Sequence, residues 1–198
     1  ALDTLFARFG VADDDSPIDA VALFGRRAPL VLEIGFGMGE TTALMADADP
    51  ERDVLAVDVH TPGVGALLAD VDRRGLDNVR VARGDAVPLL RTRIANGSLA
   101  ELRVFFPDPW PKPRHHKRRL VDAEFVDLAA TKLHSGGVLH LATDWSSYAE
   151  QMLAVVSGDD RFTVDGFAPR PASRPVTRFE NQGLAKGHEV YDVIAFRR

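Results

Sequence analysis

The 198-residue chain contains no cysteine, which excludes disulfides, thiolate metal sites and a cysteine nucleophile. No apolar run approaches the roughly 20 residues that a membrane-spanning helix needs, so we expect no membrane partner. The first residues lack the basic and long apolar regions of a signal peptide. Together these absences favour a reducing compartment, and we expect a cytoplasmic protein.

Basic residues are scarcer than acidic ones: 24 Lys and Arg face 29 Asp and Glu, for a net charge of −5. Because a tight nucleic-acid binder usually shows a basic footprint, the total argues mildly against that class. The distribution argues for it, since five cations fall within residues 112–119. His115 and His116 are adjacent and therefore unsuited to share one metal ion, and we predict no metal site.

Short apolar runs alternate with helical patterns along the chain. This alternation predicts an α/β fold with a mostly parallel sheet and helices on both faces. We expect seven strands, the last two forming an antiparallel addition. The predicted strands are 30–34, 54–57, 79–82, 102–106, 137–142, 161–164 and 190–196. The predicted helices are 40–48, 62–74, 86–95, 121–133 and 146–156.

Two stretches fall outside this alternation. Residues 168–187 are rich in Pro, Arg and Gly, which predicts a long functional loop. Residues 1–29 are expected to form a partly flexible N-terminal segment before a single domain over 30–198.

A glycine-rich turn follows the first predicted strand. Gly35, Gly37 and Gly39 give the spacing G-x-G-x-G, which allows a tight turn and the close approach of a ligand. Glu40 stands where the dinucleotide fingerprint has its third glycine, and Glu33 precedes the turn. Since two carboxylates would repel a pyrophosphate, a ligand with a cationic end fits better. S-adenosylmethionine is such a ligand, and a plain strand-to-helix turn is the alternative.

An aspartate follows each of the next two strands. Asp58 ends the second, where a carboxylate can accept hydrogen bonds from both ribose hydroxyls. Asp85 follows the third, where it could accept one from the adenine amino group. Each could instead be the N-cap of the next helix. The joint pattern of Glu33, Asp58 and Asp85 at one edge of the sheet favours the cofactor.

Asp108 follows the fourth strand in the proline-rich segment Pro107-Asp108-Pro109-Trp110-Pro111, whose prolines stiffen the backbone. An ionised carboxylate can accept the N1–H and N2–H₂ donors of guanine, which leaves N7 free to face a sulfonium. N7 already carries a lone pair, so no general base is needed. We therefore predict that Asp108 orients the base and stabilises the positive charge that forms on it.

The cations that follow this aspartate suit an RNA. Lys112 could hold a phosphate or the base carbonyl, and the run from Arg114 to Arg119 could neutralise backbone phosphates. A solvated loop is the alternative for this run. Trp110 could stack on a base or anchor the loop. Asp144, at the end of the fifth strand, could touch the substrate base or cap the next helix, whereas spacing alone assigns no function to residues 177–180.

Several of these segments together resemble the bacterial tRNA (guanine-N7)-methyltransferases, which are class I methyltransferases with a Rossmann-like fold. The proline–aspartate–tryptophan segment is the most specific of them. The similarity runs from about residue 30 to 196. The matching segments are residues 33–39, 58–65, 107–112, 115–120, 143–144, 177–180 and 187–192.

The resemblance implies methyl transfer from S-adenosylmethionine to N7 of a tRNA guanine, guanine 46 of the variable loop, with S-adenosylhomocysteine as product. It implies that Glu33, Asp58, Asp85 and Asp108 are acids of the cofactor site and that Asp108 is also catalytic. Asp58 departs mildly from relatives that carry Glu there. The implied substrate-binding residues are Lys112, Asp144, Thr177, Arg178, Phe179 and Glu180, to which the basic run adds Arg114.

Two other functions stay open at this stage. One is a methyltransferase that acts on another RNA site, and the other is a cofactor- and RNA-binding subunit without turnover. The basic run argues against a small-molecule substrate, and the intact acids argue against a subunit without turnover. The spacing of the glycines disfavours a nicotinamide dehydrogenase. We expect tRNA as the partner of a monomer or homodimer.

Overall fold

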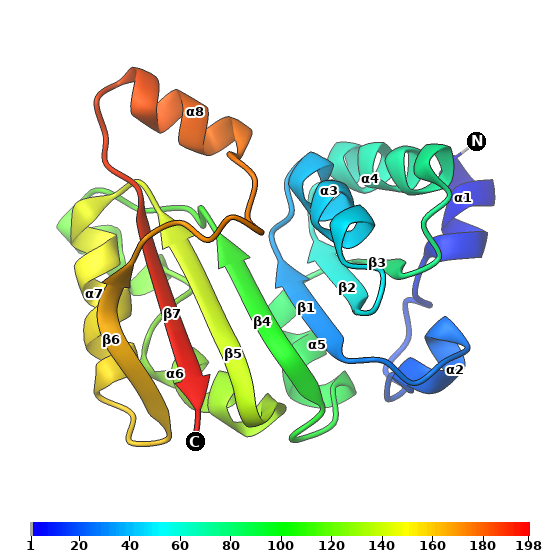
Figure 1. Ribbon diagram of the computed structural model, residues 1–198, viewed down its shortest axis with the longest axis horizontal. Helices are drawn as coiled ribbons and strands as arrows, with labels where there is room; N and C mark the ends of the chain where they lie inside the picture. The colour runs from blue at the N-terminus through cyan, green and yellow to red at the C-terminus, as the bar shows by residue number, and fades with distance from the viewer. Residues whose placement is uncertain (1) are drawn as a thin grey trace.

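Seven strands form one sheet in the computed structural model, which describes residues 2–198 except for the side chains of Leu2 and Phe179 (Figure 1). The strand order is β3-β2-β1-β4-β5-β7-β6, with β1 to β5 parallel and β7 antiparallel to both of its neighbours. The strands are β1 (Leu30–Ile34), β2 (Asp53–Asp58), β3 (Val79–Arg83), β4 (Leu99–Phe105), β5 (Leu133–Thr143), β6 (Phe162–Ala168) and β7 (Tyr191–Arg197).

Helices cover both faces of the sheet. The helices are α1 (Leu2–Phe9), α2 (Ala20–Phe24), α3 (Glu40–Ala48), α4 (Thr61–Arg74), α5 (Ala86–Arg93), α6 (Ala123–Lys132), α7 (Ser146–Ser157) and α8 (Arg178–Ala185), with a 3₁₀ helix η1 (Pro113–Arg118). One apolar core packs α5, α6 and α7 against one face, and a second packs α1, α3 and α4 against β1, β2 and β3 on the other. None of the helices within residues 2–198 is both long and apolar enough to cross a membrane.

The predicted fold class is confirmed, including the mostly parallel sheet of seven strands and the antiparallel C-terminal strand, which is β7. The structure differs from the prediction in two places. The predicted loop 168–187 contains α8, because Thr177 caps it by accepting a hydrogen bond from the Glu180 amide. The N-terminal segment forms α1 and α2, and Phe9 and Val11 are buried in the two cores. Its partial flexibility stays a prediction.

The order of the strands creates a crevice between β1 and β4. The chain passes from β1 outward to β2 and β3, and from β4 outward to β5, so the direction of winding reverses between the two central strands. Ligands of open α/β sheets bind beyond the carboxyl ends of the strands at such a point. Ile34 pairs with Val104 there, which places the glycine-rich turn and the segment after β4 side by side.

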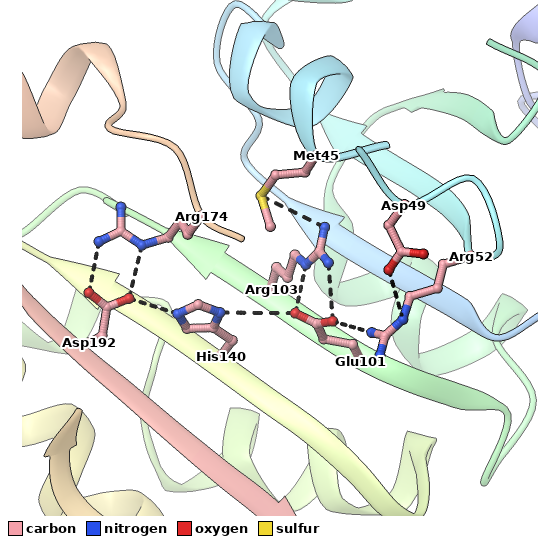
Figure 2. Close-up of polar contacts among 8 residues, drawn as sticks. All are labelled: Met45, Asp49, Arg52, Glu101, Arg103, His140, Arg174 and Asp192. Atoms are coloured by element: carbon pink, nitrogen blue, oxygen red, sulfur yellow. Dashed lines mark hydrogen bonds and ion pairs between the residues drawn. The ribbon is translucent and has the colours of Figure 1, made fainter. Parts of the chain in front are cut away.

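The segment that leads from β6 to α8 crosses in front of one end of β4, β5 and β7 (Figure 1). A row of charged side chains lies across these strands on the same face (Figure 2). Arg174 donates two hydrogen bonds to Asp192, at 2.9 and 2.7 Å. His140 Nε2 lies 2.7 Å from Asp192, and Arg103 donates two hydrogen bonds to Glu101. We call these five residues the ionic row.

The ionic row is buried, and its charges compensate one another. Burial alone would raise the pKa of Asp192, but hydrogen bonds from His140 and Arg174 outweigh it and hold that pKa below its usual range. Burial would likewise raise the pKa of Glu101, and Arg103 reverses the effect. Both carboxylates therefore stabilise the fold as anions.

We predict that acid destabilises the protein through these two carboxylates. Their contribution is complete above the pKa values of the unfolded chain and is lost as the pH falls through the lower folded values, below about pH 4. Denaturant unfolding between neutral and acidic pH should show a steep loss of unfolding free energy in that range. Asp192→Asn should be less stable at neutral pH and lose less on acidification. Parallel pH profiles for the two proteins would contradict this.

Candidate functional site

A cavity of about 470 Å³ opens at the carboxyl end of β1, beside the crevice. Its walls come from the end of β1 with the glycine-rich turn, the start of α3, the end of β4 and the start of α8. The lining residues are Glu33, Gly35, Phe36, Gly37, Met38, Gly39, Glu40, Thr41, His60, Phe105, Phe106, Thr177, Arg178 and Gln182. The structure thus joins the predicted glycine turn and the predicted segment 177–180, which are far apart in the sequence.

Glu33 is the buried acid of this cavity. Its side chain accepts a hydrogen bond from Thr42 through Oε1, at 2.8 Å, whereas the buried Oε2 has no hydrogen-bond partner among the described residues. Burial raises the pKa of Glu33, and Arg103 and Thr42 offset the shift only in part. A buried carboxylate oxygen without a donor is costly, so the site favours a cationic or donor group at this point.

The glycine-rich turn allows a ligand to approach its backbone closely. Gly35, Gly37 and Gly39 all have positive φ, at 76°, 59° and 79°, a conformation that other residues rarely adopt. A Cβ on Gly63, in α4, would lie 1.8 Å from the Gly37 carbonyl oxygen. Asp58 fixes the turn from β2, because its Oδ2 accepts a hydrogen bond from the Gly37 amide at 2.8 Å. The turn therefore presents its backbone to the cavity in one fixed shape.

Three of the predicted cofactor acids, Asp58, Asp85 and Asp108, lie outside the lining of this cavity. Asp58 borders it through the Gly37 amide and through the amide of His60, a lining residue. Asp85 caps α5 by accepting a hydrogen bond from the Val87 amide, and it lines a separate cavity of about 170 Å³. The capping alternative is thus correct for Asp85, and its contact with adenine stays a prediction.

Asp108 is exposed beyond the end of β4, and no hydrogen bond or ion pair among residues 2–198 engages its carboxylate. The backbone around it is strained, because Phe106 and Trp110 adopt φ values of 52° and 43°. Left-handed conformations of bulky residues persist where the surroundings enforce them, and they concentrate at functional sites. The segment therefore holds an unpartnered carboxylate in a defined place near the cavity.

The basic run after Asp108 divides into two groups. Arg119 is buried and donates hydrogen bonds to the Pro109 carbonyl at 2.8 Å and to Gln151 at 2.8 Å, so it holds the segment and cannot reach a phosphate. Arg118 lies over the Trp110 ring, 5.0 Å from its centroid. Trp110 is only partly buried and contacts Arg118 and His115 of η1, so both of its predicted roles stay predictions. The exposed cations of the run are Lys112, Arg114, Lys117 and Arg118, the last of which lies against the Trp110 ring.

Asp144 does not cap the helix that follows it. The N-cap of α7 is Trp145, and Asp144 instead accepts a hydrogen bond from His188 Nδ1 at 3.0 Å. Gly183 of α8 packs directly on this carboxylate, since a Cβ there would lie 2.6 Å from its Oδ2. Asp144 thus joins the end of β5 to the segment around α8, and its contact with a substrate base stays a prediction.

The predicted segment 177–180 takes different positions residue by residue. Thr177 and Arg178 line the cavity, and the side chain of Phe179 lies outside the described residues. The Glu180 carboxylate is buried and accepts a hydrogen bond from Arg174 at 2.6 Å. Its oxygens are therefore engaged within the protein and turn away from the open part of the site.

Comparison with known proteins places this geometry in a family. Residues 27–193 match the family model described as "Putative methyltransferase". The tRNA (guanine-N(7)-)-methyltransferase of Streptomyces coelicolor is 59% identical, with 100% of this chain and 74% of that protein aligned. The protein of the same name from Nitrosospira multiformis is 53% identical, with 100% of this chain and 87% of that protein aligned. The chain belongs to the bacterial tRNA (guanine-N7)-methyltransferase family.

Solved structures confirm that the family fold is that of class I methyltransferases. A 30S ribosomal A1408 methyltransferase from an uncultured bacterium superposes with a TM-score of 0.66 at 10% identity, over 96% of this chain and 99% of the other. Geranyl diphosphate C-methyltransferase from Streptomyces coelicolor, in complex with S-adenosyl-L-homocysteine, gives 0.59 at 12% identity, over 88% and 72%. These low identities bear on the fold alone.

Several residues of this methyltransferase site were not predicted from the sequence. Phe105 and Phe106 line the cavity, yet the sequence indicates only that they end a strand. His60 also lines it, within the family-like segment 58–65 but with no role predicted for its side chain, and Gln182 stands outside every matching segment. The sequence does contain a signal for the start of α8, because Thr177-x-x-Glu180 has the spacing of a capping box.

We predict that Glu33→Gln stabilises the ligand-free methyltransferase and weakens its cofactor binding. The amide keeps the shape and can still accept from Thr42, while the buried charge is gone. The unfolding free energy at neutral pH should rise by on the order of 1 kcal/mol, because each unit of a raised carboxyl pKa costs about 1.4 kcal/mol and the amide carries no charge. Calorimetric titration with S-adenosylhomocysteine should show a lower affinity. A variant that is less stable and binds normally would refute this role of Glu33.

Proposed function

We propose that this protein transfers a methyl group from S-adenosylmethionine to N7 of a guanine in tRNA, and we infer guanine 46 of the variable loop as the target. The proposal rests on one juxtaposition. An exposed, unpartnered carboxylate, Asp108, stands in a clamped loop beside a cavity whose buried acid, Glu33, has a free oxygen. Guanine suits the first group and a cationic cofactor suits the second.

The cavity residues fit S-adenosylmethionine. Glu33 would meet the cationic methionine end, the glycine-rich turn would lie against the cofactor backbone, and Asp58 would accept from the ribose hydroxyls while it holds the Gly37 amide. When bound, the cofactor supplies a methyl group on a sulfonium and leaves as S-adenosylhomocysteine. The protein's part is to fix the position of that group at the carboxyl end of β1, next to β4.

Asp108 would act on the guanine without taking a proton from it. Its carboxylate accepts N1–H and N2–H₂, which holds N7 toward the reacting methyl group. The N7 lone pair forms the new bond, and the purine gains a positive charge that the adjacent anion stabilises. Asp144 and Arg178 lie at the same edge of the sheet and would complete the base-binding surface. All of these residues come from one copy of the chain, so this part of the site forms without a second subunit.

The exposed cations Lys112, Arg114 and Lys117 would contact the tRNA backbone. No carboxylate among the described residues pairs with them, so their charge is available to phosphates. This local group explains how a chain with a net charge of −5 can bind an RNA. A tRNA substrate also accords with the expected cytoplasmic location.

The direct test is incubation of unmodified tRNA with the enzyme and labelled S-adenosylmethionine, followed by chemical cleavage at N7-methylguanine. We expect label at one guanine of the variable loop. Asp108→Asn keeps the shape but presents a donor to the donors of guanine, so kcat should fall on the order of 100- to 1000-fold. Asp165→Asn, on exposed β6, is the control with normal turnover. Folded wild-type protein that binds cofactor but transfers no methyl group would support a non-catalytic subunit, and label at another position would support another RNA site.

Substitutions of Lys117 and Arg119 should distinguish a cation that contacts the RNA from one that supports the loop. Lys117→Gln should reduce the slope of log affinity for tRNA against log salt by about 0.7–0.9, the share of one phosphate contact, without changing the melting temperature. Arg119→Gln should lower the melting temperature and leave the salt slope unchanged, because Arg119 holds Pro109 from inside. Filter binding over a salt series and thermal unfolding provide both readings. The reverse assignment of the two effects would contradict this division.

A further inference from the structure

Arg174 is fully buried, and the proposed reaction gives it no role. It lies in the segment between β6 and α8, and its guanidinium is shared among two carboxylates. Asp192 of β7 accepts two hydrogen bonds from it and Glu180 of α8 accepts one, at 2.6 Å. A guanidinium that donates to two carboxylates in a fixed geometry restricts orientation more than a lysine ammonium could.

The same guanidinium also contacts the end of β4. Its carbon lies 5.7 Å from the ring centroids of both Phe105 and Phe106. These two aromatic residues line the cavity, as Thr177 does on the other side, whereas Arg174 does not. Arg174 therefore lies behind the seam where the start of α8 meets the end of β4.

Stability alone is a poor explanation for such a residue. Buried ion pairs often contribute little compared with apolar side chains of similar volume, because the desolvation of both charges is costly. Their better-attested use is to specify one arrangement of the chain. Here the arrangement is that of Asp192, Glu180 and the Phe105–Phe106 pair, which belong to three separate elements.

We propose that Arg174 is a positioning residue that sets the tRNA-facing start of α8 in register with the strand that carries Asp108. This inference rests on the proposed function. Arg174 fixes Glu180 from behind, which leaves Thr177 and Arg178 facing the cavity. It also packs against Phe105 and Phe106, which lie three and two residues before Asp108. Glu180 acts through Arg174 and not by contact with the substrate.

The test uses Arg174→Lys, which keeps the charge but cannot form the bidentate contact with Asp192. We expect kcat/KM for tRNA to fall on the order of 100-fold, as for a displacement of about 1 Å at a reacting site, with affinity for S-adenosylhomocysteine retained. Glu180→Gln should show the same loss. The double variant should be no worse than either single variant, because both changes break the same connection, which runs from Asp192 of β7 through Arg174 to Glu180 of α8.

A structural control separates positioning from loss of stability. Lys132→Met removes another buried cation, which donates to the carbonyls of Arg91 and Ile94 near the start of β5, at the opposite end of the sheet. It should lower the melting temperature without changing kcat/KM for tRNA. If Lys132→Met reduces kcat/KM as Arg174→Lys does, or if the two single losses add in the double variant, the proposal is wrong.

Amide hydrogen exchange without tRNA provides a reading that does not depend on the reaction. In Arg174→Lys, exchange should accelerate in α8 and in residues 105–109, while β1, β2 and β3 keep their protection. If the wild-type enzyme does not methylate tRNA, the proposed function is wrong. The exchange rates in α8 and in residues 105–109 would then still test the role of Arg174. Unchanged exchange in both segments would overturn the positioning role.

Discussion

The hydrogen bonds of Arg174 with Asp192 and Glu180 fix the place of the segment that closes the site. This segment crosses the sheet over β4, β5 and β7, where charged side chains lie in place of an apolar helix interface (Figure 2). Once buried, these charges need partners, and partners with the required geometry exist only in one arrangement of the chain. The position of α8 therefore follows from electrostatic compensation within the fold more than from apolar packing.

A second constraint operates at the end of β1. Glu33 keeps one buried oxygen without a donor, and the adjacent turn adopts three positive φ values to expose its backbone. The unpartnered oxygen costs stability in the ligand-free protein and becomes favourable only when a ligand supplies the missing partner, whereas glycine adopts the positive φ values without steric cost. Asp108 is the opposite case, since its carboxylate is exposed and only its backbone is constrained. One acid is thus prepared for a cationic cofactor and the other for the donor edge of a base.

The excess of acidic residues does not conflict with RNA binding. Many carboxylates are used within the fold, as caps of helices or as partners of buried arginines. The cluster of cations between residues 112 and 119 is also partly internal, because Arg119 is buried and holds the Pro109 carbonyl. What faces the RNA is a small local group of charges, so net charge is a poor guide to the partner of this protein.

The sequence predicts the strands, the central helices and the acids at the strand ends, because short apolar runs and strand-end positions are local signals. It does not predict the burial of Arg174, whose partner Asp192 is 18 residues away and joins it only through the antiparallel insertion of β7. Arg119 was grouped with the RNA-binding cations for the same reason: a charge run shows no sign of which member turns inward. The start of α8 could have been predicted from its capping box.

A crystal structure of the enzyme with S-adenosylhomocysteine and a guanosine nucleotide or tRNA would test the roles of Asp108 and Glu33 most directly. We expect the Asp108 carboxylate to accept hydrogen bonds from N1–H and N2–H₂ of guanine, N7 to face the cofactor sulfur, and Glu33 Oε2 to accept from the cofactor ammonium. A guanine bound with N7 turned away from the sulfur, or with Asp108 out of contact with its donor edge, would contradict these roles.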